Sequence, residues 1–280
     1  MAQYDTQYTT LPEPAPRRAR WPLASVMLLD LAIIFVALLA SAALIQAVAL
    51  TVYTLNGNPL PPEDELITQL PNIMGVGGIF ATLLVQNLLF VCVPIVRVAI
   101  LRREPLAEIG FQAPNIPKLV GLGISLSLIT LFCNAILSLA FQGVGIQQNQ
   151  SAQYPLFEND YFGQFFFFIG AALIVPIGEE ILFRGYVFNA LRTTFQSKSW
   201  GIALAFFISA LLFSAAHSLS ATEGLIGLLV PTFVMGLLFA GATYISGSIL
   251  PSIIAHTINN SLGLSVLIYC VNNATVCQGL

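Results

Sequence analysis

The chain has 280 residues, of which 57% are hydrophobic and 8% charged, with a formal net charge of −3. Soluble domains carry roughly 25% charged residues, so this composition excludes a water-facing surface over the whole chain, and lipid must cover much of it. The sequence has no basic patch and no glycine-rich nucleotide-binding motif placed between a strand and a helix, which argues against a nucleic-acid partner.

The composition predicts an all-α fold, a polytopic bundle of transmembrane helices. A spanning helix needs about 20 mostly apolar residues. Seven stretches qualify: 23–53, 73–101, 118–141, 162–191, 200–217, 224–246 and 249–270. An eighth span would result if the first or second stretch were a broken pair. We divide the chain into four parts: a flexible cytoplasmic N-terminal tail (1–22), two N-terminal transmembrane helices (23–101), a helical core (103–270) and a short C-terminal tail (271–280).

The basic residues predict the orientation of these helices. With the N-terminus in the cytoplasm, all ten Lys and Arg residues fall on the cytoplasmic side or in the cytoplasmic half of a helix. The outer connectors contain acidic residues but no Lys or Arg. Cytoplasmic segments of membrane proteins are enriched in basic residues, so we expect seven spans with the C-terminus outside.

One acidic residue lies within the first predicted span. Asp30 is about 15 Å from Arg20 along a helix. We expect it to pair with a polar group on the second or third stretch, such as Gln86, Asn87 or Asn134.

The fourth stretch carries an acidic pair at membrane depth. Its sequence ALIVPIGEEILFRGYVFNAL places Glu179 and Glu180 after an apolar run, with Arg184 one turn later. A charged side chain at the bilayer centre costs at least ~2.5 kcal/mol, so it is a functional candidate by default. Glu180 and Arg184 have the i,i+4 spacing of a helical ion pair, whereas Glu179 points about 100° away. Glu179 is therefore the candidate general base. The alternative is an ion pair that only holds two helices together.

Both histidines of the chain lie in the spans that follow. His217 closes the segment FFISALLFSAAH, one turn after Phe213, and His256 shares a helix face with Asn260. A single intramembrane histidine usually makes a hydrogen bond between helices, but this larger polar set favours a common site. A rise of ~1.5 Å per residue from one cytoplasmic level gives heights of about 20 Å for Glu179, 25 Å for His217 and 10 Å for His256. The estimate allows one site but leaves a spread of about 15 Å.

In this order the motifs resemble those of the CAAX-protease and bacteriocin-processing (CPBP) family of intramembrane proteases, which includes the Ras-converting CAAX prenyl endopeptidase. The family pattern is EExxxR, FxxxH and HxxxN. The chain contains all three motifs: Glu179-Glu180-x-x-x-Arg184, Phe213-x-x-x-His217 and His256-x-x-x-Asn260. The flanking segments EPLAEIGFQ and GSILPSIIAH also resemble the family. The resemblance extends over about residues 103–265, which makes the helical core a protease-like core, and it is absent from the first two predicted helices.

The resemblance implies hydrolysis of a peptide bond inside the membrane. It assigns the activation of a water molecule to Glu179 and His217, and the stabilisation of the oxyanion to His256 and Asn260. These roles agree with the chemistry of the side chains. A carboxylate and an imidazole can activate a water, and an amide and a suitably protonated imidazole can donate to a developing oxyanion.

The remaining motif residues have supporting roles in this scheme. Glu180 and Arg184 would orient the helix and the base, and Phe213 precedes His217 by one turn. Metal dependence stays open, because the family is often described as metalloproteases. A zinc ion could be bound by one glutamate and two histidines, namely Glu179, His217 and His256. The sequence has no H-E-x-x-H motif, and the same residues suffice without a metal, so we slightly favour metal-free hydrolysis.

Three classes of function remain open from the sequence. The first is the intramembrane protease. The second is a proton-coupled transporter, which the lack of visible inverted repeats weakens. The third is a non-catalytic scaffold or regulator with the same fold. A protease of this type would act in the lipid bilayer on a membrane-associated protein or peptide, prenylated or not. The compact size and short loops favour a bacterial inner (plasma) membrane.

Overall fold

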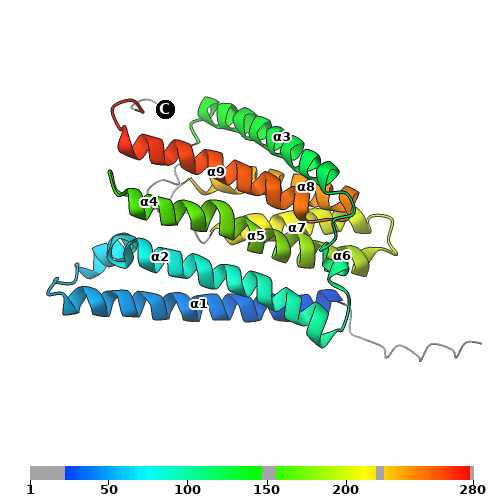
Figure 1. The fold of residues 1–280 in the computed structure, drawn as a ribbon, viewed down its shortest axis with the longest axis horizontal. Coiled ribbons are helices and arrows are strands. Elements are labelled where there is room, and N and C mark those ends of the chain that lie inside the picture. The colour runs from blue at the N-terminus through cyan, green and yellow to red at the C-terminus, as the bar shows by residue number, and fades with distance from the viewer. Residues whose placement is uncertain (1–22, 147–155, 219–223, 278–280) are drawn as a thin grey trace, which may run out of the picture.

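The structure is a computed structural model that describes residues 23–146, 156–218 and 224–277, and these residues form helices, turns and loops without a strand. Its long helices lie side by side in one bundle (Figure 1). The predicted all-α transmembrane fold is confirmed. Six helices in the described ranges are long and apolar enough to cross a membrane, and Gly201–His217 is a shorter apolar helix. The predicted tail, 1–22, lies outside the described residues.

The helices follow the predicted spans closely. The first half of the chain forms two long helices, a short turn and a third long helix: α1 (Leu23–Leu55), α2 (Glu63–Ile95) with its π-helical extension η1 (Val96–Leu101), the 3-10 helix η2 (Leu106–Ile109), and α3 (Ile116–Gly143). One continuous helix, here called the central helix, then has five parts: α4 (Tyr161–Phe168), η4 (Ile169–Ile174), α5 (Val175–Glu180), η5 (Ile181–Val187) and α6 (Phe188–Phe195). Three further helices complete the bundle: α7 (Gly201–His217), α8 (Leu225–Ser246) and α9 (Leu250–Asn272).

Helix α2 differs from its prediction at the N-terminal end. It begins at Glu63 rather than at residue 73, so part of the predicted polar connector 54–72 is helical. The first turn holds three acidic residues, which favour a helix N-terminus because they complement its positive dipole. Gly75 then adopts a left-handed φ of 58° and breaks the helical path. This break coincides with the predicted start of the apolar span.

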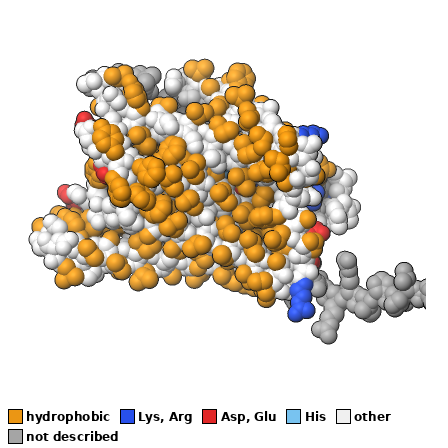
Figure 2. Space-filling model, viewed as in Figure 1, with side chains coloured by type: hydrophobic (Ala, Val, Ile, Leu, Met, Phe, Trp, Pro, Cys, Tyr) orange, Lys and Arg blue, Asp and Glu red, His pale blue; other side chains and the backbone are white. Residues whose placement is uncertain are grey.

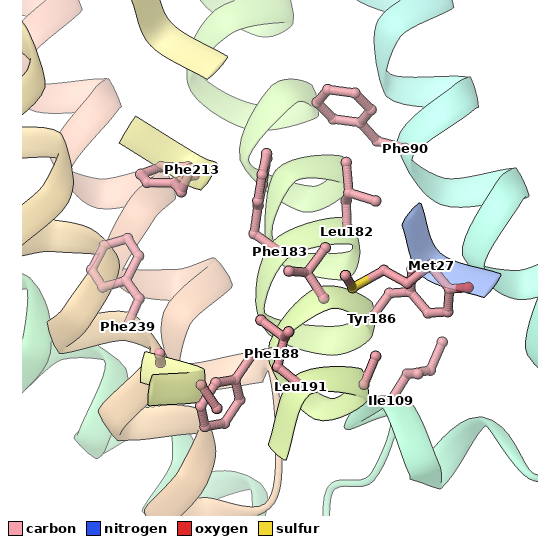
Figure 3. Packing of buried hydrophobic residues seen from close by; sticks show 14 of the residues in the cluster. Met27, Phe90, Ile109, Leu182, Phe183, Tyr186, Phe188, Leu191, Phe213 and Phe239 are labelled. Atoms are coloured by element: carbon pink, nitrogen blue, oxygen red, sulfur yellow. The ribbon is translucent and has the colours of Figure 1, made fainter. Parts of the chain in front are cut away.

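The central helix lies inside the bundle. Every residue from position 178 to position 191 is buried, whereas many large apolar residues of α1 and α3 are exposed. Figure 3 shows its side chains in contact with residues from the surrounding helices, among them Phe90 of α2, Phe213 of α7 and Phe239 of α8. Neighbouring helices thus cover this part of the central helix on all sides. The polar residues within it are therefore shielded from lipid.

The outer surface has the charge distribution of a membrane protein. Apolar side chains cover the face seen in Figure 2, and charged side chains gather at its two ends. Lys and Arg lie at the end where α1 begins, on the right in Figures 1 and 2, whereas α9 ends at the opposite side. The chain is therefore an integral membrane protein whose two ends differ in charge.

Asp30 ties α1 to α2 and to the central helix. Its carboxylate accepts hydrogen bonds from Arg97 Nε at 2.8 Å, from Arg97 Nη2 at 2.5 Å, and from the Tyr186 hydroxyl at 2.5 Å. Asp30 is 2% exposed and Tyr186 is fully buried. The predicted partners Gln86, Asn87 and Asn134 were wrong. Arg97 lies in η1, the π-helical continuation of α2, and its side chain extends from there to the Asp30 carboxylate.

Removal of the Asp30 carboxylate is expected to destabilise the protein. In Asp30→Leu the Arg97 guanidinium and the Tyr186 hydroxyl lose their acceptor, which should cost roughly 3 kcal/mol. The double variant Asp30→Leu/Arg97→Met removes both charges and should lose clearly less stability than the single variant. Thermal unfolding of the detergent-solubilised protein measures both. Equal losses in the single and double variants would contradict a coupled pair.

Candidate active site

Glu180 is the centre of the polar cluster on the central helix. Its side chain is 0% exposed, and Oε1 accepts a hydrogen bond from Arg184 Nη1 at 3.0 Å. The same oxygen lies 2.9 Å from Nδ1 of His256, which comes from α9. A carboxylate oxygen can only accept hydrogen bonds, so we assign Nδ1 of His256 as the donor in this contact. The contact between Glu180 and Arg184 expected from their spacing is present.

Glu179 approaches the same histidine from the other ring nitrogen. Its Oε2 lies 3.7 Å from Nε2 of His256, which is longer than a hydrogen bond. Glu179 is also buried, with a relative exposure of 7% for the residue and 10% for its side chain. His256 therefore lies between two carboxylates, and Glu180 orients its ring.

The Phe213 ring joins the two histidines of the chain. Its centroid is 4.7 Å from the ring of His217 and 6.0 Å from the ring of His256. The Arg184 guanidinium lies 3.9 Å from the same centroid, close enough for a cation–π contact. His217 also places Nδ1 2.9 Å from the carbonyl oxygen of Phe213, which fixes the ring against α7. Phe213 is thus part of the site wall, in contact with three of its polar residues.

Asn260 extends the site along α9. It lies one turn beyond His256, and its Nδ2 donates to the carbonyl oxygen of Ala171 at 3.1 Å. Ala171 belongs to the π-helical segment η4, where the backbone departs from the regular α-helical hydrogen-bond pattern. The structure therefore places Asn260 against the backbone of the central helix. The remaining polar motif residues, Glu179, Arg184, His217 and His256, lie around Glu180 and Phe213.

Two π-helical segments flank the glutamates. Segment η4 ends at Ile174 and η5 begins at Ile181, which leaves Glu179 and Glu180 at the end of a six-residue α-helix. Insertions of this kind shift the faces that a helix presents and occur often at functional sites.

The start of α9 explains why His256 reaches the glutamates. Ile249, which precedes α9, donates its N–H to the carbonyl oxygen of Gly110 at 3.1 Å. A Cβ at Gly185 would lie 3.7 Å from Cγ2 of Ile249, so Gly185 and Ile249 are at the same level. We take Arg192, near the end of the central helix, as the cytoplasmic level from which the heights were estimated. Gly185 is seven residues, or about 10 Å, from that level along the helix. His256 is therefore about 20 Å deep, level with Glu179, and the predicted spread was wrong for this residue.

The two flanking segments that resemble the protease family are in contact. Besides the bond between Gly110 and Ile249, Gln112 Nε2 donates to the carbonyl oxygen of Gly247 at 2.6 Å. Both glycines have left-handed φ values, 79° at Gly110 and 69° at Gly247. These contacts hold the start of α9 inside the bundle. Together the two segments set the depth of His256.

The geometry does not favour the predicted metal ligands. Across the described ranges, no three His, Cys, Asp or Glu side chains are arranged so that they could hold a metal ion. Glu179, His217 and His256, which the sequence suggested as zinc ligands, therefore do not fit such a centre.

Sequence reasoning missed two residues of the site. Phe239 of α8 lies with its ring centroid 5.5 Å from His256 and 5.2 Å from the Arg184 guanidinium carbon. Tyr186 anchors the central helix to Asp30. A hydroxyl in an otherwise apolar segment could have pointed to Tyr186, whereas Phe239 is one of 20 phenylalanines and carries no distinguishing signal.

Comparison with known proteins places this site in a protease-like segment. Residues 161–262 match the family model described as "Type II CAAX prenyl endopeptidase Rce1-like". The predicted family resemblance is confirmed for this segment. It begins with α4, ends in α9 and contains every residue of the three motifs.

A curated relative is known from Escherichia coli, under the name "Uncharacterized 24.3 kDa protein". It is 35% identical over 92 residues, which are 33% of this chain and 40% of that protein. The chain thus spans less than half the length of this relative. No solved structure matches.

Gly110 provides a test of the deep start of α9. In Gly110→Ala the new Cβ would lie 2.8 Å from Cγ2 of Ile249, at a φ of 79°. Gly57 has a similar φ of 82° but open space around it, so Gly57→Ala carries the backbone strain alone. Gly110→Ala should therefore lose about 1–3 kcal/mol more stability than Gly57→Ala, as measured by thermal unfolding. Equal losses would show that the contact with Ile249 does not constrain α9.

Proposed function

We propose that this protein is an intramembrane endopeptidase of the CAAX-protease type, which hydrolyses a peptide bond of a membrane-associated substrate. The observation that carries the proposal is the convergence of Glu179 and Glu180 on His256 within a segment that resembles a type II CAAX prenyl endopeptidase. Buried charged side chains are costly in a membrane. Glu179, Glu180 and Arg184 are all buried in the segment that matches the family model, which supports a catalytic role for this cluster.

Glu179 acts as the general base of the proposed reaction. Together with His217 it binds a water molecule and takes one of its protons as the water oxygen attacks the scissile carbonyl carbon. The new C–O bond gives a tetrahedral intermediate with a negative oxygen. As the C–N bond breaks, Glu179 returns the proton to the leaving nitrogen. Glu180 cannot take this role, because it is engaged with Arg184 and His256.

His256 and Asn260 stabilise the oxyanion in this scheme. Glu180 accepts from Nδ1 of His256 and so fixes the orientation of the ring, and in the proposed scheme Nε2–H donates to the oxyanion. The amide of Asn260 has two N–H donors, one of which goes to Ala171, and the second donates to the oxyanion. Such donors are effective in a site without bulk water, because the low dielectric strengthens their interaction with the developing charge.

The proposed reaction proceeds without a metal step. The described residues provide no three-ligand centre, and the proposed steps need only proton transfer by side chains and hydrogen bonds such as that between Glu180 and His256.

The orientation proposed for the protein has the N-terminus in the cytoplasm and the C-terminus outside. Lys and Arg lie at the end of the bundle where α1 begins, and such residues are enriched on the cytoplasmic side. Cys270 and Cys277, at the far end of α9, form a disulfide. Disulfides persist in oxidising compartments, so this bond supports an extracytoplasmic C-terminus in a bacterial inner membrane.

Loss of the proposed base should abolish hydrolysis. We expect Glu179→Gln and His217→Ala to lower the cleavage rate about 100-fold or more, since each removes a group that activates the water. The assay uses the protein in liposomes with farnesylated CAAX peptides and unprenylated transmembrane peptides. The exposed Glu65→Gln is the control and should cleave like wild type. Unchanged cleavage in both site variants would refute the mechanism.

A chelator distinguishes metal-free from metal-dependent hydrolysis. Because the proposed water is activated by side chains alone, 1,10-phenanthroline should leave the cleavage rate of the wild-type protein in liposomes unchanged. Loss of cleavage with the chelator, followed by recovery on addition of Zn²⁺, would contradict the metal-free reaction.

Fusions at the C-terminus test the orientation. Alkaline phosphatase joined after the last residue should be active in cells, because it folds only outside the cytoplasm, and green fluorescent protein at the same position should be dark. The opposite pair of results would show a cytoplasmic C-terminus.

A further inference from the structure

Helix α2 contacts the central helix directly before the proposed base. Oδ1 of Asn87 accepts a hydrogen bond from the backbone N–H of Gly178 at 2.9 Å. Gly178 directly precedes Glu179, so this bond holds the Ile177–Gly178 peptide unit, one peptide unit before the base. Asn87 lies outside the segment that matches the protease family, and neither the motifs nor the resemblance indicates it.

The contact depends on the lack of a side chain at Gly178. A Cβ there would overlap Oδ1 of Asn87 and would lie 3.0 Å from its Cγ and 3.2 Å from Cβ of Phe90. The two helices are therefore close enough for the amide to reach the backbone only because position 178 is glycine. The pair forms a fixed contact between α2 and α5 rather than a surface interaction.

The backbone around Glu179 needs such support. The glutamates lie in a six-residue α-helix between two π-helical segments, and π-helical backbone is rare because its geometry is less favourable. A second anchor follows the pair, since Tyr186 of η5 donates to Asp30 of α1. The N-terminal helices thus hold the central helix on both sides of the glutamates.

We propose that Asn87 is a positioning residue that sets the place of the Glu179 carboxylate through the backbone of Gly178. This inference deepens the proposed function and rests on Glu179 as its base. It makes the two N-terminal helices part of the hydrolytic apparatus. A small displacement of a catalytic group lowers the rate of the chemical step more than it lowers substrate binding.

Three variants separate this role from general packing. Asn87→Leu has a similar volume but no acceptor, whereas Asn87→Asp keeps an acceptor oxygen at the same position. Gln86→Leu is the matched control, because it removes the adjacent polar side chain of α2 from the same apolar span. The full-length protein is used in liposomes throughout, and thermal unfolding confirms that each variant is folded.

Two readouts need no substrate. Hydrogen–deuterium exchange of the peptide that contains Gly178 should be about fivefold faster in Asn87→Leu, because its amide loses its acceptor. The rate at which dicyclohexylcarbodiimide, an apolar reagent for buried carboxyl groups, modifies Glu179 should change in the same variant. Exchange should stay at its wild-type value in Asn87→Asp, and both readouts should stay at wild-type values in Gln86→Leu. Unchanged exchange or unchanged Glu179 modification in Asn87→Leu would overturn the proposal.

Hydrolysis of the peptide that the wild-type protein cleaves gives the third readout. In Asn87→Leu, kcat should fall about 10- to 100-fold with little change in KM, and Asn87→Asp should restore most of kcat. A change in KM with kcat unchanged in Asn87→Leu would contradict a positioning role. An equal loss of kcat in Gln86→Leu would contradict it as well. If wild type cleaves none of the peptides, the proposed function fails, while exchange and Glu179 modification still decide whether Asn87 positions the carboxylate.

Discussion

A fully buried carboxylate inside a membrane helix determines the arrangement of this site. Glu180 has no access to water, so its charge requires donors from the protein. Arg184 supplies one donor from the same helix and His256 supplies the other from α9. The contact with Arg184 follows from local helix geometry, but the contact with His256 requires α9 to begin deep in the bundle. The left-handed turns at Gly110 and Gly247 and the contact of Ile249 with Gly185 meet that requirement.

The same constraint explains the aromatic surroundings. Arg184 is 1% exposed, and the rings of Phe213 and Phe239 lie close to its guanidinium. Phe213 also separates the rings of His217 and His256, so one side chain both shields a cation and spaces two imidazoles. Removal of water from such a site strengthens each remaining polar contact. A cluster built in this way combines structural support with the electrostatic conditions that hydrolysis needs.

The sequence predicted what depends on local spacing and failed where distant contacts decide. The helical spans, the pairing of Glu180 with Arg184 and the motif residues follow from apolar runs and from i,i+4 geometry. The depth of His256 could not be predicted, because the start of α9 is set by a contact between Gly110 and Ile249, which are far apart in the chain. The partner of Asp30 was missed for the same reason, since Arg97 reaches it from the end of another helix. The π-helical segments beside the glutamates have no recognised sequence signal.

The bond between Glu180 and His256 is the central claim, and the chain is well suited to test it because it has only two histidines. With ¹⁵N-labelled imidazoles and His217→Ala for assignment, ¹⁵N NMR of the protein in liposomes reports the protonation of each ring nitrogen of His256. The account predicts a protonated, hydrogen-bonded Nδ1 in wild type and a clear shift of its resonance in Glu180→Gln. An unprotonated Nδ1 in wild type, or a resonance that Glu180→Gln leaves unchanged, would contradict it.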